Sequence, residues 1–215
     1  MPEVKQVLVD IEPSAGRVVS AVLDAGGPVQ IRLSGKVVVN ACSWEQESPA
    51  CRALADSFDI FFCAEKQLSD FSFYPVPEFF IFATDRHGGS IGTIGGQGDL
   101  VDDVYPVGYV EGGEGHKIAD SLRDFFEMAV YYPCWREIVR SVRAHAPYSL
   151  ADLLADYETR NAVSGNDRRL LQRTLQLRHN PRSIEKLLAC MRERAALIVY
   201  ASKSEAARVN QFQEI

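Results

Sequence analysis

The stretch that decides the fold covers residues 88–115 and reads GGSIGTIGGQGDLVDDVYPVGYVEGGEG. It holds ten of the fifteen glycines of the chain and no lysine or arginine. Glycine tolerates positive φ and lets two backbones approach closely, so this density predicts tight turns between short strands. A dense apolar run over residues 79–83 precedes the stretch, and a helix signal beginning at Ser121 follows it. The order predicts a strand, a glycine-rich excursion and a capped helix.

The residues before this stretch are typical of β-structure. Short runs rich in valine and isoleucine are separated by turn-forming residues, and these runs cover 4–11, 18–23, 29–33 and 37–42. The tripeptide Ser34-Gly35-Lys36 lies between the last two runs and predicts a hairpin loop.

The next elements are expected to alternate between helix and strand. Ser48 followed by Pro49 predicts the N-terminus of a helix. We then expect a buried strand over residues 58–64 and a short helix over 65–71, before the strand at 79–83.

After Ser121 the chain is expected to be helical to its end. Apolar residues recur at helical spacing in five stripes, which cover residues 122–129, 135–142, 150–157, 170–177 and 184–198. A boundary near Pro147 divides a core of residues 1–146 from a basic helical extension of residues 147–215. The sequence therefore predicts an α+β fold, in which helices flank a mainly antiparallel sheet and a helical C-terminal tail is added.

Composition is that of an ordinary globular protein, with 47% hydrophobic and 24% charged residues in a chain of 215. The five cysteines are odd in number and have no zinc-site spacing, so we expect free thiols in a reducing compartment. The first residues do not resemble a secretory signal, and no apolar run reaches the roughly 20 residues of a membrane span. We expect a cytoplasmic protein that does not enter a membrane.

Charge is divided unevenly along the chain. Residues 1–135 hold 9 Lys and Arg against 20 Asp and Glu, whereas residues 136–215 hold 14 against 9. An acidic front argues against nucleic acid as the main partner. The basic rear could bind an acidic protein, the acidic part of the same chain or, less favourably, RNA.

The motifs give no positive signal for a cofactor, a metal or catalysis. The glycine-rich stretch lacks GxGxxG and GxxxxGK[ST], and its acids do not follow the EF-hand pattern. His87 and His116 flank the stretch, and Cys63 or Ser90 with His87 is a nucleophile-and-base alternative that sequence alone leaves open. We expect no cofactor, no metal ligands and no catalytic residues.

The middle of the chain resembles the SUKH superfamily, a group of bacterial immunity proteins and fungal cell-wall-assembly regulators. The resemblance rests on the order of five segments, which are FFCAEKQL (61–68), YPVPEFFIFATD (74–85), HGGSIG (87–92), YPVGYV (105–110) and KIADSLRDFF (117–126). It covers roughly residues 55–135. Two features depart from the family: strands are predicted over residues 1–45, where a leading helix is usual, and the helical tail is longer.

The resemblance implies a non-enzymatic protein-binding module, such as an immunity protein that neutralises a toxin by direct binding. An acidic face would suit toxins that act on nucleic acids, because such toxins tend to be basic. We predict that the partner-binding residues line the acidic stretch, with two tyrosines as aromatic anchors. They are Asp85, Asp99, Asp102, Asp103, Tyr105, Tyr109, Glu111 and Glu114.

Two other functions remain open. The chain could be a scaffold or regulatory subunit that holds a larger complex through its basic tail, and deletion of residues 148–215 would then abolish assembly. It could also be a hydrolase that uses His87 or His116. The sequence predicts neither the oligomeric state nor the identity of the partner.

Overall fold

The computed structural model describes residues 4–12, 17–24, 30–42, 45, 47–101, 105–161 and 164–210, with side chains from residue 34 onward. Its centre is a sheet in the order β10-β9-β8-β7-β4, and β5 pairs with the same edge of β7 as β4. The strands are β4 (Lys36–Val38), β5 (Phe61–Phe62), β7 (Phe79–Thr84), β8 (Ser90–Ile94), β9 (Val107–Glu111) and β10 (Glu114–Ala119). Among these strands only β4 and β7 pair in parallel. The α+β class and the mainly antiparallel sheet are confirmed.

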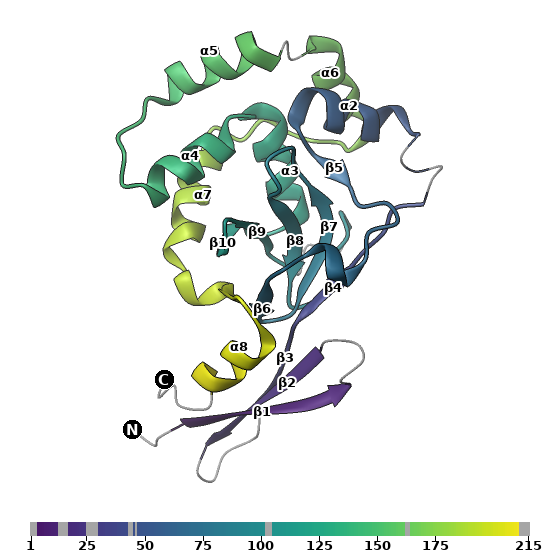
Figure 1. Cartoon of the computed structure of the whole chain (residues 1–215). Helices are drawn as coiled ribbons and strands as arrows, with labels where there is room; N and C mark the ends of the chain where they lie inside the picture. The colour runs from purple at the N-terminus through teal and green to yellow at the C-terminus, as the bar shows by residue number, and fades with distance from the viewer. Residues whose placement is uncertain are drawn as a thin grey trace.

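Helices pack around this sheet (Figure 1). They are α2 (Pro49–Phe58), α3 (Leu122–Tyr131), α4 (Trp135–Arg143), α5 (Leu150–Asn161), α6 (Gly165–Thr174), α7 (Ser183–Arg192) and α8 (Lys203–Asn210). Ser48 Oγ accepts from Cys51 N at 3.2 Å, and Ser121 Oγ accepts from Asp124 N at 3.0 Å. Both predicted N-caps are therefore confirmed. In the described part of the chain, no helix has the length and apolar character that crossing a bilayer requires.

One large buried cluster joins the sheet to the helices. Tyr109 of β9 and Trp135 of α4 are fully buried, and their rings meet edge to face at a centroid distance of 5.1 Å. A smaller cluster on the other face of the sheet contains Phe79, Ile81 and Leu197. Residues of β7 alternate between the two faces, since Phe82 contacts the Phe125 ring in the large cluster while Phe79 and Ile81 belong to the small one.

The N-terminal strands form a separate three-stranded antiparallel sheet, β1 (Val4–Glu12), β2 (Arg17–Asp24) and β3 (Gln30–Ser34). The predicted hairpin at Ser34-Gly35-Lys36 is wrong, because β3 pairs with β2 and β4 pairs with β7. Gly35, with φ 107°, donates to Pro75 O and accepts from Phe79 N. Its backbone bonds with a distant segment, so the chain passes directly from one sheet into the other.

The basic C-terminal extension is part of the same core. Tyr157, Leu171 and Leu187 are buried in the large cluster with Phe125 and Trp135. Deletion of residues 148–215 would open this core, so it cannot separate a scaffold from a binding module.

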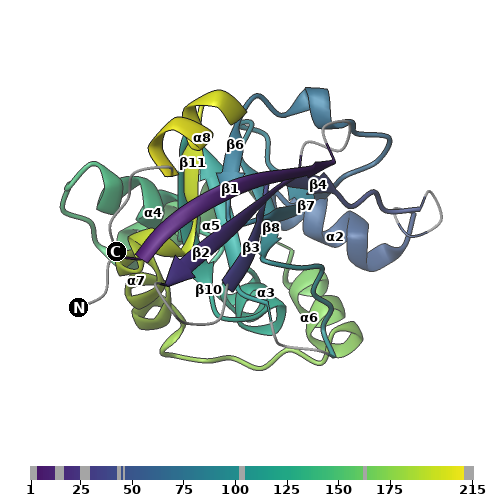
Figure 2. The same cartoon turned by 90° about the horizontal axis from the view of Figure 1, so that it is seen from below.

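The predicted helix over residues 184–198 ends early. α7 stops at Arg192, a 3₁₀ turn covers Arg194–Ala196, and β11 (Ile198–Tyr200) pairs antiparallel with β6 (Tyr74–Val76). Burial of Leu197 and pairing with a distant strand override the local helical pattern. α8 follows and lies against β1, and Figure 2 shows these two elements next to each other.

Two further local predictions need correction. α2 extends to Phe58 and ends at Asp59, whose φ is 57°, so the strand expected over residues 58–64 shortens to β5. The helix expected over 65–71 is a single 3₁₀ turn, η2 (Leu68–Asp70). A tight C-cap, the two-residue strand β5 and a short turn therefore connect α2 to β6.

Candidate functional site

Asp85 and Tyr109, two of the predicted partner contacts, lie in the interior. Tyr109 Oη donates to Asp85 Oδ2 at 2.6 Å, and Arg136 Nε donates to the same oxygen at 3.0 Å. Asp85 Oδ1 accepts from the backbone N–H groups of His87 and Gly89 at 2.9 and 2.8 Å. The Asp85 side chain has no exposed surface and Tyr109 is fully buried, so neither presents itself to a partner.

The buried carboxylate of Asp85 is ionised despite its position. Burial alone raises the pKa of a carboxyl group. The hydrogen bond from Tyr109, the charge of Arg136 and the two backbone N–H groups outweigh burial, and together they hold the pKa of Asp85 below its usual range. Burial and the neighbouring carboxylate raise the pKa of Tyr109, which therefore stays protonated and donates. This network fixes the β7–β8 turn against α4.

Glu111 and Glu114 have their charges matched by arginines of α4. Glu111 accepts from Arg140 Nη2 at 2.6 Å and from Arg143 Nη1 at 3.2 Å. Glu114, which is 60% exposed, accepts from Arg143 Nε at 2.7 Å. Burial would raise the pKa of Glu111, but the hydrogen bond and charge of Arg140 lower it. The start of the basic rear of the chain thus binds the acidic part of the same chain.

Asp99 and Tyr105 lie elsewhere, on the loop that joins β8 to β9. Thr93 Oγ1 donates to Gly96 O at 2.5 Å and accepts from Gly98 N at 3.4 Å, which anchors the loop to β8. The Tyr105 ring packs on the Gly96 backbone, because a Cβ at Gly96 would lie 2.4 Å from it. Asp99 is exposed, and its Oδ1 accepts from Val101 N at 2.7 Å.

Asp102 and Asp103 lie outside the described residues. The six described members of the predicted set do not form one continuous acidic face. They divide into a buried pair (Asp85, Tyr109), an arginine-paired hairpin (Glu111, Glu114) and an exposed loop (Asp99, Tyr105).

Beside the exposed loop is a cavity of about 440 Å³, which we call the apolar hollow. It lies between α2, β5, β7, α3 and the loop, and its aromatic walls are Phe62, Phe80, Phe82 and Phe126. Ala50 of α2 and Leu122 of α3 also line it. Two carboxylate residues, Glu45 and Asp99, belong to the lining. A pocket of this size with apolar walls and few polar groups suits one large apolar side chain or a small ligand.

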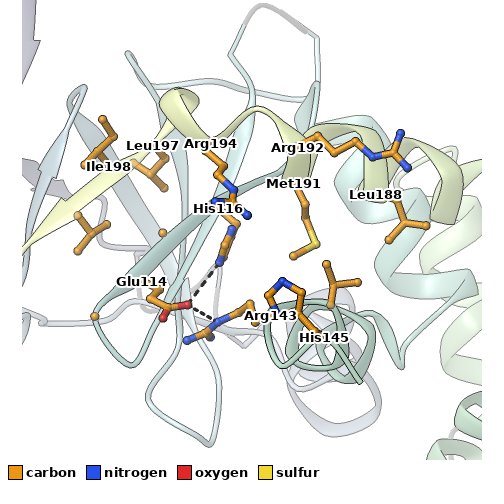
Figure 3. A pocket seen from close by; sticks show the side chains of 14 residues that line it. Glu114, His116, Arg143, His145, Leu188, Met191, Arg192, Arg194, Leu197 and Ile198 are labelled. Atoms are coloured by element: carbon orange, nitrogen blue, oxygen red, sulfur yellow. Dashed lines mark hydrogen bonds and ion pairs between the residues drawn. The ribbon is translucent and has the colours of Figure 1, made fainter. Parts of the chain in front are cut away.

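A second cavity, of about 690 Å³, lies beside the β9–β10 turn, and we call it the cationic cavity (Figure 3). Its lining includes three arginines, Arg143, Arg192 and Arg194, and two histidines, His116 and His145. Glu114 is the one acidic residue among the described residues that line it. The sequence singles out Glu114 as a partner contact and His116 as a candidate base, but it does not indicate this cavity, because the lining comes from β10, α4, α7 and the segment leading into β11, which are distant in the chain.

Among the described residues, no hydrogen bond joins His87 to Cys63 or Ser90, the pairs of the nucleophile-and-base alternative. His87 is exposed, while Ser90 is 2% exposed and Cys63 is 1% exposed. Burial raises the pKa of the Cys63 thiol to about 11, so at neutral pH it is not the nucleophilic thiolate. All five cysteines are free thiols, as predicted.

One cluster has the composition of a metal site but already contains a cation. Ligand atoms of Asp120, Cys190 and Glu193 lie within 4.8 Å of one another. The ammonium of Lys117 lies 2.8 Å from Asp120 and 2.9 Å from Glu193. Although burial lowers the pKa of Lys117, hydrogen bonds to these two carboxylates raise it more. We therefore interpret the cluster as an ion-pair network.

Comparison with known proteins adds no relative: no protein-family model, no curated protein and no solved structure matches this chain.

Proposed function

We propose that this chain is a non-enzymatic protein-binding module whose partner places a large apolar side chain in the apolar hollow. The single observation that supports this is the hollow itself. Phe62, Phe80 and Phe82 in its walls are only partly buried, so the hollow exposes apolar surface to solvent. A space of about 440 Å³ walled by four phenylalanines is therefore an unfilled position for an apolar group. Interfaces concentrate their binding energy in such desolvated pockets.

Charge at the hollow favours a basic partner. Asp99 and Glu45 contribute carboxylates to the lining, and the sequence continues past Asp99 with Asp102 and Asp103. The whole stretch from residue 88 to 115 has no lysine or arginine. The electrostatic attraction of these negative charges accelerates the encounter with a positively charged protein, and it weakens as salt is added.

The resemblance to the SUKH superfamily makes this proposal more specific. It implies an immunity protein. A basic toxin that acts on nucleic acids is the partner whose charge is complementary to the carboxylates of Glu45 and Asp99 at the hollow. Under this proposal Asp99, Asp102, Asp103 and Tyr105 remain candidate contacts. Asp85 and Tyr109 have a structural role instead, and Glu111 and Glu114 have arginine partners within the chain.

The test fills the hollow and leaves the rest of the surface unchanged. Ala50→Met extends a side chain from α2 into the hollow, and methionine is a good helix former. Ala155→Met is the matched control, because Ala155 is an exposed residue of α5 that does not line the hollow. Tagged wild-type and variant proteins are compared by pull-down from the native cells at low and high salt, with mass spectrometry as the readout.

The expected result is a basic protein retained by the wild type and by Ala155→Met at low salt, shed at high salt and lost with Ala50→Met. Asp99→Asn should weaken retention, whereas Asp152→Asn on exposed α5 should not. Equal capture by wild type and Ala50→Met, with unchanged Tm, would remove the hollow as the docking site. A partner set that is indifferent to salt and to Asp99 would favour the scaffold function.

A further inference from the structure

The cationic cavity is built where four separate segments meet. β10 contributes Glu114 and His116, the end of α4 contributes Arg143, α7 contributes Met191, and the segment after α7 contributes Arg194 (Figure 3). Gly115 makes the meeting possible, because a Cβ there would lie 2.6 Å from Val199 Cγ2. The close approach of β10 and β11 thus forms one wall.

Much of the lining is apolar. The apolar side chains are Val142, Leu188, Met191, Leu197, Ile198 and Val199. Val142, Leu188, Ile198 and Val199 are partly exposed and form the accessible apolar surface. Leu197 and Met191 lie beneath it, at 1% and 7% exposure. A volume of about 690 Å³ falls within the usual range of small-molecule sites.

The polar part of the lining is strongly positive. Among the described residues that line the cavity are three arginines and one glutamate, in a chain whose net charge is −6. Arg143 is held in place by Glu111 and Glu114. Arg194 has no hydrogen bond or ion pair with any of the described residues. Figure 3 shows Arg194 beside His116, while Arg192 points away from it.

His116 adds a polar atom that lacks a partner. Its Nε2 is buried, lies 3.8 Å from Glu114 Oε2 and makes no hydrogen bond within the described part of the chain. Burial and the charges of Arg143 and Arg194 lower the pKa of His116, although Glu114 opposes them. The lowered pKa favours the uncharged ring at neutral pH, and the tautomer with its proton on Nε2 would donate to a bound oxygen.

We propose that the cationic cavity binds an amphipathic organic anion, whose oxyanion head lies against Arg194 and His116 and whose apolar body covers Val142 and Leu188. An arginine without a partner and an unbonded histidine nitrogen provide the donors that an oxyanion needs. An inorganic anion would contact the donors but leave the apolar wall uncovered, so we expect a ligand that also has an apolar body. This site is separate from the apolar hollow and does not depend on the proposed protein partner.

The test uses two probes with the same kind of aromatic body. 8-Anilinonaphthalene-1-sulfonate bears an anionic head, and N-phenyl-1-naphthylamine is its uncharged counterpart. Binding to the native wild-type protein is followed by fluorescence at neutral pH. We expect saturable binding of the sulfonate at least about tenfold tighter than that of the amine, which corresponds to one good polar interaction. Displacement by decanoate or by decyl phosphate then distinguishes a carboxylate head from a phosphate head.

Variants locate the probe. Arg194→Gln should weaken sulfonate binding about tenfold and leave the amine unaffected, since it removes one charged donor. Val142→Phe should weaken both probes by filling the cavity. Arg173→Gln, which removes an equal charge from an exposed residue of α6, and Ala50→Met, which fills the apolar hollow, are the controls and should change neither.

Equal affinity for both probes, or sulfonate binding that is insensitive to Arg194→Gln, would overturn the proposal. So would loss of sulfonate binding in Ala50→Met, because the probe would then occupy the other cavity. If Val142→Phe fails to fold, Arg194→Gln still decides the matter, because Arg194 is exposed and has no structural partner among the described residues.

Discussion

Arg136 donates from Nε to the carboxylate of Asp85 at 3.0 Å, and the two side chains are 3% and 0% exposed. The same guanidinium donates to Phe58 O at 3.2 Å and to Asp59 O at 2.6 Å, which are carbonyls at the C-terminal end of α2. One side chain therefore links α4, the β7–β8 turn and the end of α2. Its charge is compensated by a carboxylate and also by the negative end of a helix dipole.

Removal of this guanidinium should be strongly destabilising. Arg136→Met leaves Asp85 buried without its counter-ion and deprives two carbonyls of their donor, so we expect a loss of about 3 to 5 kcal/mol in unfolding free energy. Arg182→Met is the control, because Arg182 is 78% exposed in its pair with Glu185 and should cost less than about 1 kcal/mol. Urea denaturation measures both, and similar losses for the two variants would contradict this interpretation.

The Asp85 carboxylate should make stability depend on acid in a defined direction. Its folded pKa lies below the value near 3.9 of an unfolded aspartate. Its contribution is therefore fully present above about pH 4 and is lost as the pH falls through the folded pKa. Titration of the Asp85 carboxyl carbon by NMR should show a midpoint below that of the same group in urea-unfolded protein. A folded midpoint at or above the unfolded one would show that burial outweighs the donors.

Gly89 should not tolerate even one methyl group. A Cβ there would lie 2.4 Å from Tyr109 Oη and 2.6 Å from Asp85 Oδ2, both of which are fixed in the buried network. We expect Gly89→Ala to cost about 2 to 3 kcal/mol, at the upper end of ordinary overpacking. Gly165→Ala is the matched control: no atom lies within 4 Å of its added Cβ, and it should be neutral or slightly stabilising. Thermal unfolding compares the two, and equal Tm values would refute the close-packing argument.

Local signals in the sequence predicted the regular elements, and long-range contacts caused the failures. Ser48 and Ser121 are N-caps that depend only on their own next turn, and both were identified. Gly35 was interpreted as a hairpin residue, but its partners are Pro75 and Phe79. The helix at residues 184–198 ended early because β6, more than a hundred residues upstream, pairs with β11.

The prediction that Asp85 and Tyr109 face a partner was wrong for a related reason, since a sequence shows the sign of a charge but not its burial. Asp85 and Asp99 are the same residue type in the sequence. In the structure Asp85 is enclosed by Tyr109 and Arg136, whereas Asp99 is exposed. The cationic cavity was missed because Arg143 and Arg194 are brought to His116 only by folding. The segregation of charge along the chain was the available signal, and the interpretation that the basic rear binds the acidic front is confirmed at Glu111 and Glu114.

The C-terminal extension should be indispensable for folding. Leu171 of α6 is fully buried in the cluster that contains Phe125 and Trp135, so a protein ending at residue 147 would expose that cluster to water. We expect the shortened chain to show no cooperative unfolding transition by circular dichroism.

The milder variant Leu171→Ala should fold and lose about 2 to 5 kcal/mol, as a large-to-small core substitution does. Leu68→Ala, at a side chain that is 37% exposed, should cost far less. A cooperative transition in the shortened chain would mean that residues 1–147 form a domain of their own, and a small loss with Leu171→Ala would show that α6 adds little to the core.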